Sequence, residues 1–302
     1  MVVELTLVDA LPNTNTSMTN FEDSLARAAG LLQQADALVI AAGAGMGVDS
    51  GLPDFRGNTG FWKAYPALAN AGLEFTQIAS PAAFHSLPEL AWGFYGHRLD
   101  LYRRTRPHAG FSLLKRWGER MERGYSVFTS NVDGQFQQSG FDAQRINECH
   151  GSIHHLQCLQ GCSADIWPAD AFAPDVDAAA CSLRNAPPSC QRCGGMARPN
   201  ILMFGDWDWN GQQQAAQQAR QQRWLGSVER PLVIELGAGS AIPSVRHFSQ
   251  TVVQNYGGRL IRINLREAEV ADRRDVGLAM SALDGLNRIA AMLDKRADTS
   301  RE

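Results

Sequence analysis

The residues Ala37-Leu-Val-Ile-Ala-Ala42, followed directly by Gly43-Ala-Gly-Met-Gly47, decide the fold of this chain. Six consecutive apolar residues that stop at a glycine predict a strand buried on both faces of a parallel sheet. Glycines after such a strand permit a tight turn and a close approach of the backbone to a pyrophosphate, which the N-terminus of a following helix can bind. The stretch therefore indicates an α/β fold with a nucleotide site, and a glycine turn without a ligand is the alternative.

Similar short apolar runs recur along the chain. Strands are predicted at 125–129, 232–236 and 260–264, with a weaker candidate at 145–149, and a first helix is predicted over 21–34. Strands separated by helical stretches predict a Rossmann-type, doubly wound parallel sheet. An ordinary dehydrogenase has an acidic residue at the end of a second strand about 20 residues after the glycines. This chain continues as Val48-Asp-Ser-Gly-Leu-Pro-Asp-Phe-Arg-Gly57 without such a strand, which argues against that class.

Two regions interrupt the alternation of strands and helices. Residues 56–108 are helix-like and rich in aromatic side chains, and residues 151–205 carry five of the six cysteines. We predict that they form a smaller lobe, as a helical insertion and a zinc-binding module. A Gln-rich stretch, 212–222, is predicted to be a solvated helix without a function. The predicted sheet domain comprises residues 21–55, 109–150 and 206–302, and residues 1–20 are predicted to be a flexible tail.

The overall composition narrows the class of protein. With 302 residues, 44% of them hydrophobic and 20% charged, the chain can bury a sizeable core and is not globally disordered. Its net charge of −3 does not favour a protein that binds nucleic acid through bulk charge. It has no apolar stretch of 18 residues and no basic leader, so we expect a cytoplasmic protein without membrane or nucleic-acid partners.

The cysteines form two closely spaced pairs, Cys158-x3-Cys162 and Cys190-x2-Cys193. Four thiolates can fill the tetrahedral positions around Zn²⁺ and leave none for water, which predicts a structural metal site. The alternative is four unrelated thiols. Cys181 is a possible substitute ligand, and Cys149 is more simply a buried strand thiol.

Polar residues follow two of the predicted strands. In Thr129-Ser-Asn-Val-Asp133, Asn131 and Asp133 could face the crevice where doubly wound sheets bind ligands, or form an Asx-type turn cap. In Cys149-His-Gly-Ser152, His150 could act as a general base, since its unperturbed pKa lies near the working pH. A structural or surface histidine is the alternative.

In their order along the chain, these motifs resemble the sirtuin family of NAD-dependent protein deacylases. The resemblance covers roughly residues 21–295. It includes three more segments: Arg198-Pro-Asn-Ile-Leu-Met-Phe-Gly205, Gly237-Ala-Gly-Ser240 and Ile261-Arg-Ile-Asn264.

The resemblance implies a cleft that holds NAD and an acyl-lysine protein or peptide, with nicotinamide, free lysine and O-acyl-ADP-ribose as products. His150 would be the base acting on the ribose hydroxyls, Asn131 and Asp133 would lie in the nicotinamide pocket, and Phe55 would cover that pocket. Phe204 and Gly205 would border a groove in which the peptide pairs as an added strand. The implied cofactor-binding residues are Gly43, Ala44, Gly45, Asp54, Phe55, Arg56, Ser130, Asn131, Asp133, His150, Gly237, Ser240 and Asn264.

The segment around Tyr95-x2-Arg98 bears on the acyl group. It resembles sirtuins in which a Tyr-x-x-Arg pair binds the carboxylate of succinyl, malonyl or glutaryl lysine. An arginine fork beside a phenol suits a buried carboxylate, and the spacing places both side chains on one side of a helix. The alternative is an aromatic helix that packs one face and leaves Arg98 on the surface.

Two departures from the family pattern keep other functions open. Ser130 stands where the family usually has glutamine, and the segment Gly237-Ala-Gly-Ser240 replaces Gly-Thr-Ser-x, with its later proline displaced to Pro243. The leading hypothesis is an NAD-dependent lysine deacylase, either a deacetylase or a desuccinylase/demalonylase. The alternatives are an NAD glycohydrolase or mono-ADP-ribosyltransferase on the same scaffold, and a non-catalytic module that senses NAD or ADP-ribose.

Overall fold

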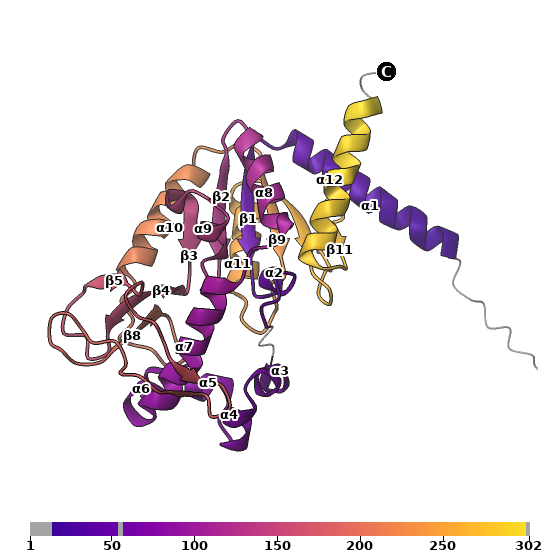
Figure 1. Ribbon diagram of the computed structural model, residues 1–302. Helices are drawn as coiled ribbons and strands as arrows, with labels where there is room; N and C mark the ends of the chain where they lie inside the picture. The colour runs from indigo at the N-terminus through magenta and orange to yellow at the C-terminus, as the bar shows by residue number, and fades with distance from the viewer. Residues whose placement is uncertain (1–13, 54–56, 300–302) are drawn as a thin grey trace, which may run out of the picture.

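A six-stranded parallel sheet forms the centre of the computed structural model, which describes residues 14–53 and 57–299 (Figure 1). Its strand order, β3-β2-β1-β9-β10-β11, is the order of a Rossmann sheet, and the predicted α/β fold class is confirmed. The predicted strands are present, although β3 is shorter than expected, and β11 was not predicted. The strands are β1 (Ala37–Ala42), β2 (Tyr125–Thr129), β3 (Ile146–Glu148), β9 (Pro231–Leu236), β10 (Arg259–Ile263) and β11 (Val276–Leu278).

Helices cover both faces of this sheet. Leu38 and Ile40 of β1 pack in one apolar core with α1 (Thr14–Gln34), α8 (Ala109–Arg120) and α12 (Ala282–Thr299). Val39 and Ala41 point to the other face, where α10 (Gln212–Leu225) and α11 (Ser244–Asn255) pack. Helix α1 begins at Thr14 and not at the predicted Phe21, because the polar residues between them include no Pro or Gly that would stop a helix.

A second lobe combines the two insertions (Figure 1). Trp92 and Phe84 of the helical insertion share one apolar core with Leu156 and Ala197 of the cysteine-bearing insertion. Its helices are α3 (Gly57–Ala64), α4 (Pro66–Asn70), α5 (Phe75–Ile78), α6 (Pro81–Ser86) and α7 (Pro88–Arg104). Its strands are β4 (Gly151–Cys158), β5 (Ile166–Pro168) and β8 (Ala197–Ile201) in one antiparallel sheet, and β6 (Val176–Asp177) and β7 (Ser182–Leu183) in a hairpin.

The β6–β7 hairpin packs directly on α7. A Cβ at Gly93 would lie 2.0 Å from the carbonyl oxygen of Cys181, so only glycine permits this approach. Cys181 itself has a positive φ of 50° and is buried. The hairpin thus braces the helix that carries Tyr95 and Arg98.

The Gln-rich helix α10 differs from the solvated helix that we predicted. Gln217 and Gln221 are buried against the edge of the sheet, because their amides satisfy the polar groups of β2 and β3. Gln221 Nε2 donates to Ser126 Oγ at 2.9 Å, and Gln217 Oε1 accepts the Glu148 amide at 3.0 Å. A periodicity analysis counts glutamine as polar and misses a face that is buried by hydrogen bonding.

The remaining elements are short: α2 (Gly45–Val48), α9 (Gln135–Gln138) and a 3₁₀ turn (Ala143–Arg145). Within residues 14–53 and 57–299, no helix combines the length and apolarity that a membrane span requires.

Candidate active site

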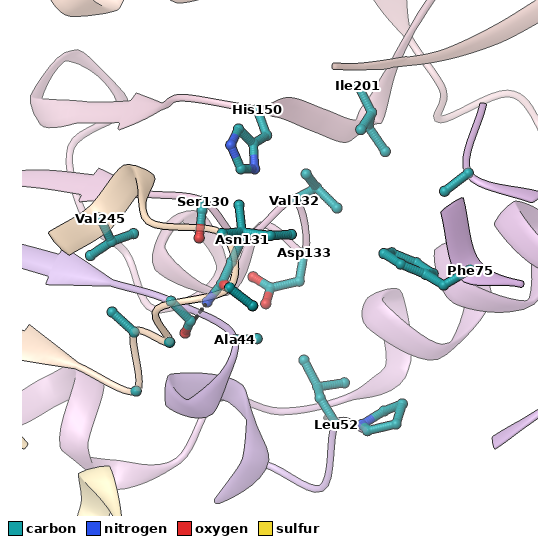
Figure 2. Close-up of a pocket in the computed structure, with 18 of the residues that line it drawn as sticks. Ala44, Leu52, Phe75, Ser130, Asn131, Val132, Asp133, His150, Ile201 and Val245 are labelled. Atoms are coloured by element: carbon teal, nitrogen blue, oxygen red, sulfur yellow. Dashed lines mark hydrogen bonds between the residues drawn. The ribbon is translucent and has the colours of Figure 1, made fainter. Parts of the chain in front are cut away.

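A cavity of about 690 Å³ lies between the carboxyl ends of the central strands and the second lobe (Figure 2). Ala44 follows β1, Asn131 follows β2 and Gly237 follows β9, and all three line it. From β1 the chain adds β2 and β3 on one side of the sheet, and β9, β10 and β11 then follow on the other side. The point between β1 and β9 is thus the switch point of the strand order, where doubly wound sheets bind ligands. The second lobe contributes the opposite wall.

Two glycine-containing turns form the floor of the cavity. Gly43 and Gly237 line it, whereas Gly45 lies behind and donates its amide to the Gly237 carbonyl at 3.0 Å. A Cβ at Gly43 would lie 2.8 Å from Ala238 Cα, and one at Gly237 would lie 2.4 Å from Gly45 Cα. Helix α2 is only one turn long, so a pyrophosphate there would depend on close backbone approach more than on a helix dipole.

The segment after β2 is held by its own hydrogen bonds. Thr129 Oγ1 donates to the Ala42 carbonyl at 3.1 Å, and Asn131 Nδ2 donates to the Gly43 carbonyl at 3.0 Å. Asp133 Oδ1 accepts the Gln135 amide at 2.9 Å, so the carboxylate forms an Asx turn just before α9 and also lines the cavity. Burial raises the pKa of Asp133 to about 6. The turn-cap and cavity interpretations of this residue are therefore both correct.

His150 stands between β3 and β4, and its ring points toward Ser130 and Asn131 in the lining of the cavity (Figure 2). Its Nε2 lies 3.2 Å from Ser244 Oγ, at the start of α11. Burial lowers the pKa of the imidazole, and a hydrogen bond to the backbone of Ser130 offsets part of that effect. The ring is consequently neutral near pH 7, the state that a general base requires.

Two of the predicted cofactor-binding residues, Ser240 and Asn264, are placed differently. Ser240 lines the cavity, whereas Asn264 is 2% exposed and lies behind its wall. Asn264 Nδ2 donates to the Ala238 carbonyl at 2.8 Å, and its Oδ1 accepts the amides of Arg266 and Glu267. Asn264 thus joins two loops, and the side chains beyond it, Arg266 and Glu267, reach the cavity.

Helix α7 supplies the far wall. Tyr95 and Arg98 both line the cavity, and Arg98 is 8% exposed, so the surface-arginine alternative is wrong. The phenol that bonds to Arg98 is Tyr102, whose hydroxyl lies 2.9 Å from Arg98 Nε. Burial works against the charge of Arg98, but the phenols of Tyr102, Tyr95 and Tyr65 outweigh it and raise its pKa. The guanidinium stays charged within an aromatic surround.

Other predicted residues have mixed placements. Phe204 lines the cavity and is partly exposed at its rim, whereas Gly205 is outside the lining. Asp54, Phe55 and Arg56 lie outside the described residues. Several residues that line the cavity were not predicted from the sequence, namely Leu52, Phe75, Tyr102, Ile242, Arg266 and Glu267. Of these, Tyr102 could have been found, because its four-residue spacing from Arg98 places both side chains on one side of a helix.

The four predicted metal ligands come together. The Sγ atoms of Cys158, Cys162, Cys190 and Cys193 all lie within 4.8 Å of one another, as tetrahedral thiolate coordination requires. Backbone hydrogen bonds, first that of Cys193 and then that of the Arg192 amide, which donates to Cys190 Sγ at 3.4 Å, lower the pKa of Cys190 to about 7. The donor set fits Zn²⁺, and four thiolates leave no open position for catalysis. Cys149 and Cys181 lie outside the cluster.

Strand order, cavity position and the four-cysteine lobe together define a class, namely Rossmann-type α/β proteins with an inserted zinc-binding lobe. Residues 43–225 match the model of the Sir2 family, and the chain belongs to that family. The predicted resemblance to sirtuins is confirmed.

Individual relatives agree with this assignment. An NAD-dependent protein deacetylase from Shouchella clausii is 31% identical over 234 residues, which are 77% of this chain and 84% of that protein. An NAD-dependent protein deacylase 2 from Pyrobaculum aerophilum is 28% identical over 277 residues, 90% of this chain and 96% of that protein. The crystal structure of a Sir2 homolog–NAD complex superposes with a TM-score of 0.68 at 22% identity, over 89% of this chain and 94% of that chain, and shows the shared fold.

Proposed function

We propose that the protein is an NAD-dependent protein-lysine deacylase. One observation carries the proposal. A single cavity at the switch point of the sheet brings together a neutral base, His150, the polar pair Asn131 and Asp133, and a buried charged Arg98. The relatives named above are deacylases and deacetylases that depend on NAD, and their similarity spans most of this chain.

The residues present fit NAD. Gly43, Ala44 and Gly237 line the floor, and the two glycines let the turns after β1 and β9 pack closely, because a Cβ at either would meet the backbone of the other turn. Ser240 and Glu267 lie on the side of β9 and β10, and Asn131 and Asp133 lie deeper, after β2. When bound, NAD supplies an activated ribose that can accept the acyl group. The chain's contribution is to hold it, to exclude water and to accept a proton.

His150 is the residue that we assign to proton transfer. It lines the cavity, it is neutral near pH 7, and its Nε2 is within hydrogen-bond reach of a hydroxyl, that of Ser244. A neutral imidazole in this position can take the proton of a ribose hydroxyl. Asp133, with its raised pKa, is suited to a polar contact at the inner end of the cavity.

Within this function we propose a preference for acyl groups that carry a carboxylate, such as succinyl or malonyl. Arg98 is charged and buried, and it lines the cavity between Tyr95 and Tyr102. A carboxylate beside a planar guanidinium and two phenols can form charge-assisted hydrogen bonds in a site of low dielectric. An acetyl group has no carboxylate with which to form such bonds.

The test is nicotinamide release, measured with and without acetyl-lysine and succinyl-lysine peptides of one sequence. Release that requires a peptide and is lost in His150→Ala supports the deacylase. Release without peptide would identify a glycohydrolase, and no release at all, with NAD still bound, would identify a sensing module. Faster release with acetyl than with succinyl peptide would overturn the acyl preference alone.

A further inference from the structure

Ser244 is a hydroxyl residue that touches His150 from a separate element. It is the first residue of α11, and its Oγ lies 3.2 Å from His150 Nε2. The N-cap position of the helix is Pro243, one residue before Ser244, and the Ser244 hydroxyl is directed to His150. The loop that follows β9 and contains Ser240 leads directly into this contact.

We propose that Ser244 is a positioning residue for His150, whose hydroxyl donates to Nε2 and holds the imidazole in the tautomer that leaves Nε2 unprotonated. This inference rests on the proposed function only for its effect on the reaction. The tautomer itself is a property of the protein without ligands.

The place of the contact indicates its direction. A neutral imidazole has one N–H and one lone pair, and a serine hydroxyl can donate or accept, so the Nε2–Oγ distance of 3.2 Å fits either tautomer. Ser244 is the first residue of α11, where the positive end of the helix dipole favours a lone pair over an N–H. We therefore assign the free lone pair to Nε2 and the donor role to the Ser244 hydroxyl.

This arrangement prepares the base for its task. Without Ser244, the ring loses the hydrogen bond that directs Nε2 toward the start of α11. The Nε2–Oγ distance of 3.2 Å is longer than the ~2.8 Å typical of hydroxyl donors, so a substrate hydroxyl that arrives at Nε2 can displace the Ser244 hydroxyl. A Ser244 hydroxyl that is readily displaced from Nε2 suits His150, because this nitrogen must accept a proton in each catalytic cycle.

The charged groups around His150 are engaged elsewhere. Glu148 bonds to Gln217 of α10, Asp133 accepts the Gln135 amide, and Arg246 of α11 pairs with Glu267 at 3.1 Å. The other titratable groups on the adjoining elements are Cys149, His154, His155, Cys158 and His247. The pKa of His150 departs from its usual value through burial and the Ser130 bond, with no contribution from these charges.

The experiment is ¹⁵N NMR of the imidazole of His150 in the ligand-free protein, combined with kinetics. In the wild type at pH above the titration of His150, Nε2 is expected to have the shift of an unprotonated, hydrogen-bonded nitrogen. In Ser244→Ala we expect the titration midpoint of His150 to rise, because a bond that favours the neutral ring is lost. We also expect kcat at pH 7 to fall roughly tenfold with little change in KM for NAD, as loss of one hydrogen bond in the transition state implies.

Controls separate this role from a structural one. Ser244→Thr keeps the hydroxyl and should restore both readouts. Thr251→Ala removes an exposed hydroxyl from the same helix, bonded to the His247 carbonyl, and should change neither. A protonated Nε2 in the neutral wild-type ring, or an unchanged midpoint in Ser244→Ala, overturns the proposal. If the NMR results hold but no deacylation is found, the proposed function fails and the positioning role stands.

Discussion

Replacing Arg98 with methionine tests the acyl preference most sharply. Methionine keeps much of the volume of the buried side chain and removes its charge. In the proposed complex, the acyl carboxylate would lie against a guanidinium that is 8% exposed and surrounded by Phe94, Tyr95 and Tyr102. Removing one partner of a buried, hydrogen-bonded charge pair costs about 2–5 kcal/mol. At about 1.4 kcal/mol per factor of ten, kcat/KM for a succinyl peptide should fall roughly 30- to 4,000-fold.

The assay compares succinyl-lysine and acetyl-lysine peptides of one sequence on the same variant. The acetyl peptide has no carboxylate, so its kcat/KM should change by less than about threefold, within the effect of an ordinary packing change. Arg104→Met is a matched control, because Arg104 is exposed on the same helix and pairs with Asp100 at the surface. Equal losses on both peptides in a folded Arg98→Met protein, or no loss on either, would refute the reasoning.

Three further predictions concern stability and the metal. Burial raises the pKa of Asp133 to about 6, above its value in the unfolded chain, so the native state binds more protons and its stability falls as pH rises from about 4 to 6. In urea unfolding, Asp133→Asn should therefore raise the free energy of unfolding by up to roughly 3 kcal/mol at pH 7.5 and by little at pH 4.5. An equal effect at both pH values would contradict this. Cys190→Ser should lose bound zinc and melt at lower temperature, as should the wild type with a chelator, whereas Cys149→Ala should keep one zinc by elemental analysis. Gly93→Ala should destabilise the protein by about 1–3 kcal/mol in the same urea assay, since its methyl group would meet the Cys181 carbonyl; wild-type stability would show that the hairpin can shift freely.

The sheet and the metal cluster were predictable because each rests on a local pattern. The run 37–42 is apolar at every position and becomes the central strand, buried on both faces. The paired cysteines need only their spacing and a turn to converge. By contrast, β11 is three residues long, and a segment of that length is stabilised by its pairing with β10 more than by its own sequence.

Site residues that directly follow strands were predicted from the sequence, whereas those whose side chains are placed by tertiary packing were not. Asn131, Asp133 and His150 reach the cavity because the carboxyl ends of parallel strands share one edge. Asn264 follows β10 in the same way, yet its amide turns to the Ala238 carbonyl, a contact between loops 26 residues apart. The contact of Ser244 with His150 spans 94 residues and depends on how α11 is seated, which no local pattern encodes.

The fate of the acyl group tests the central claim most directly. Mass spectrometry of one reaction with NAD and a succinyl-lysine peptide can count nicotinamide, deacylated peptide and the acyl product together. We predict equal amounts of all three, with the acyl group on ADP-ribose. Free succinate released without nicotinamide, or nicotinamide released while the peptide keeps its acyl group, would contradict the account.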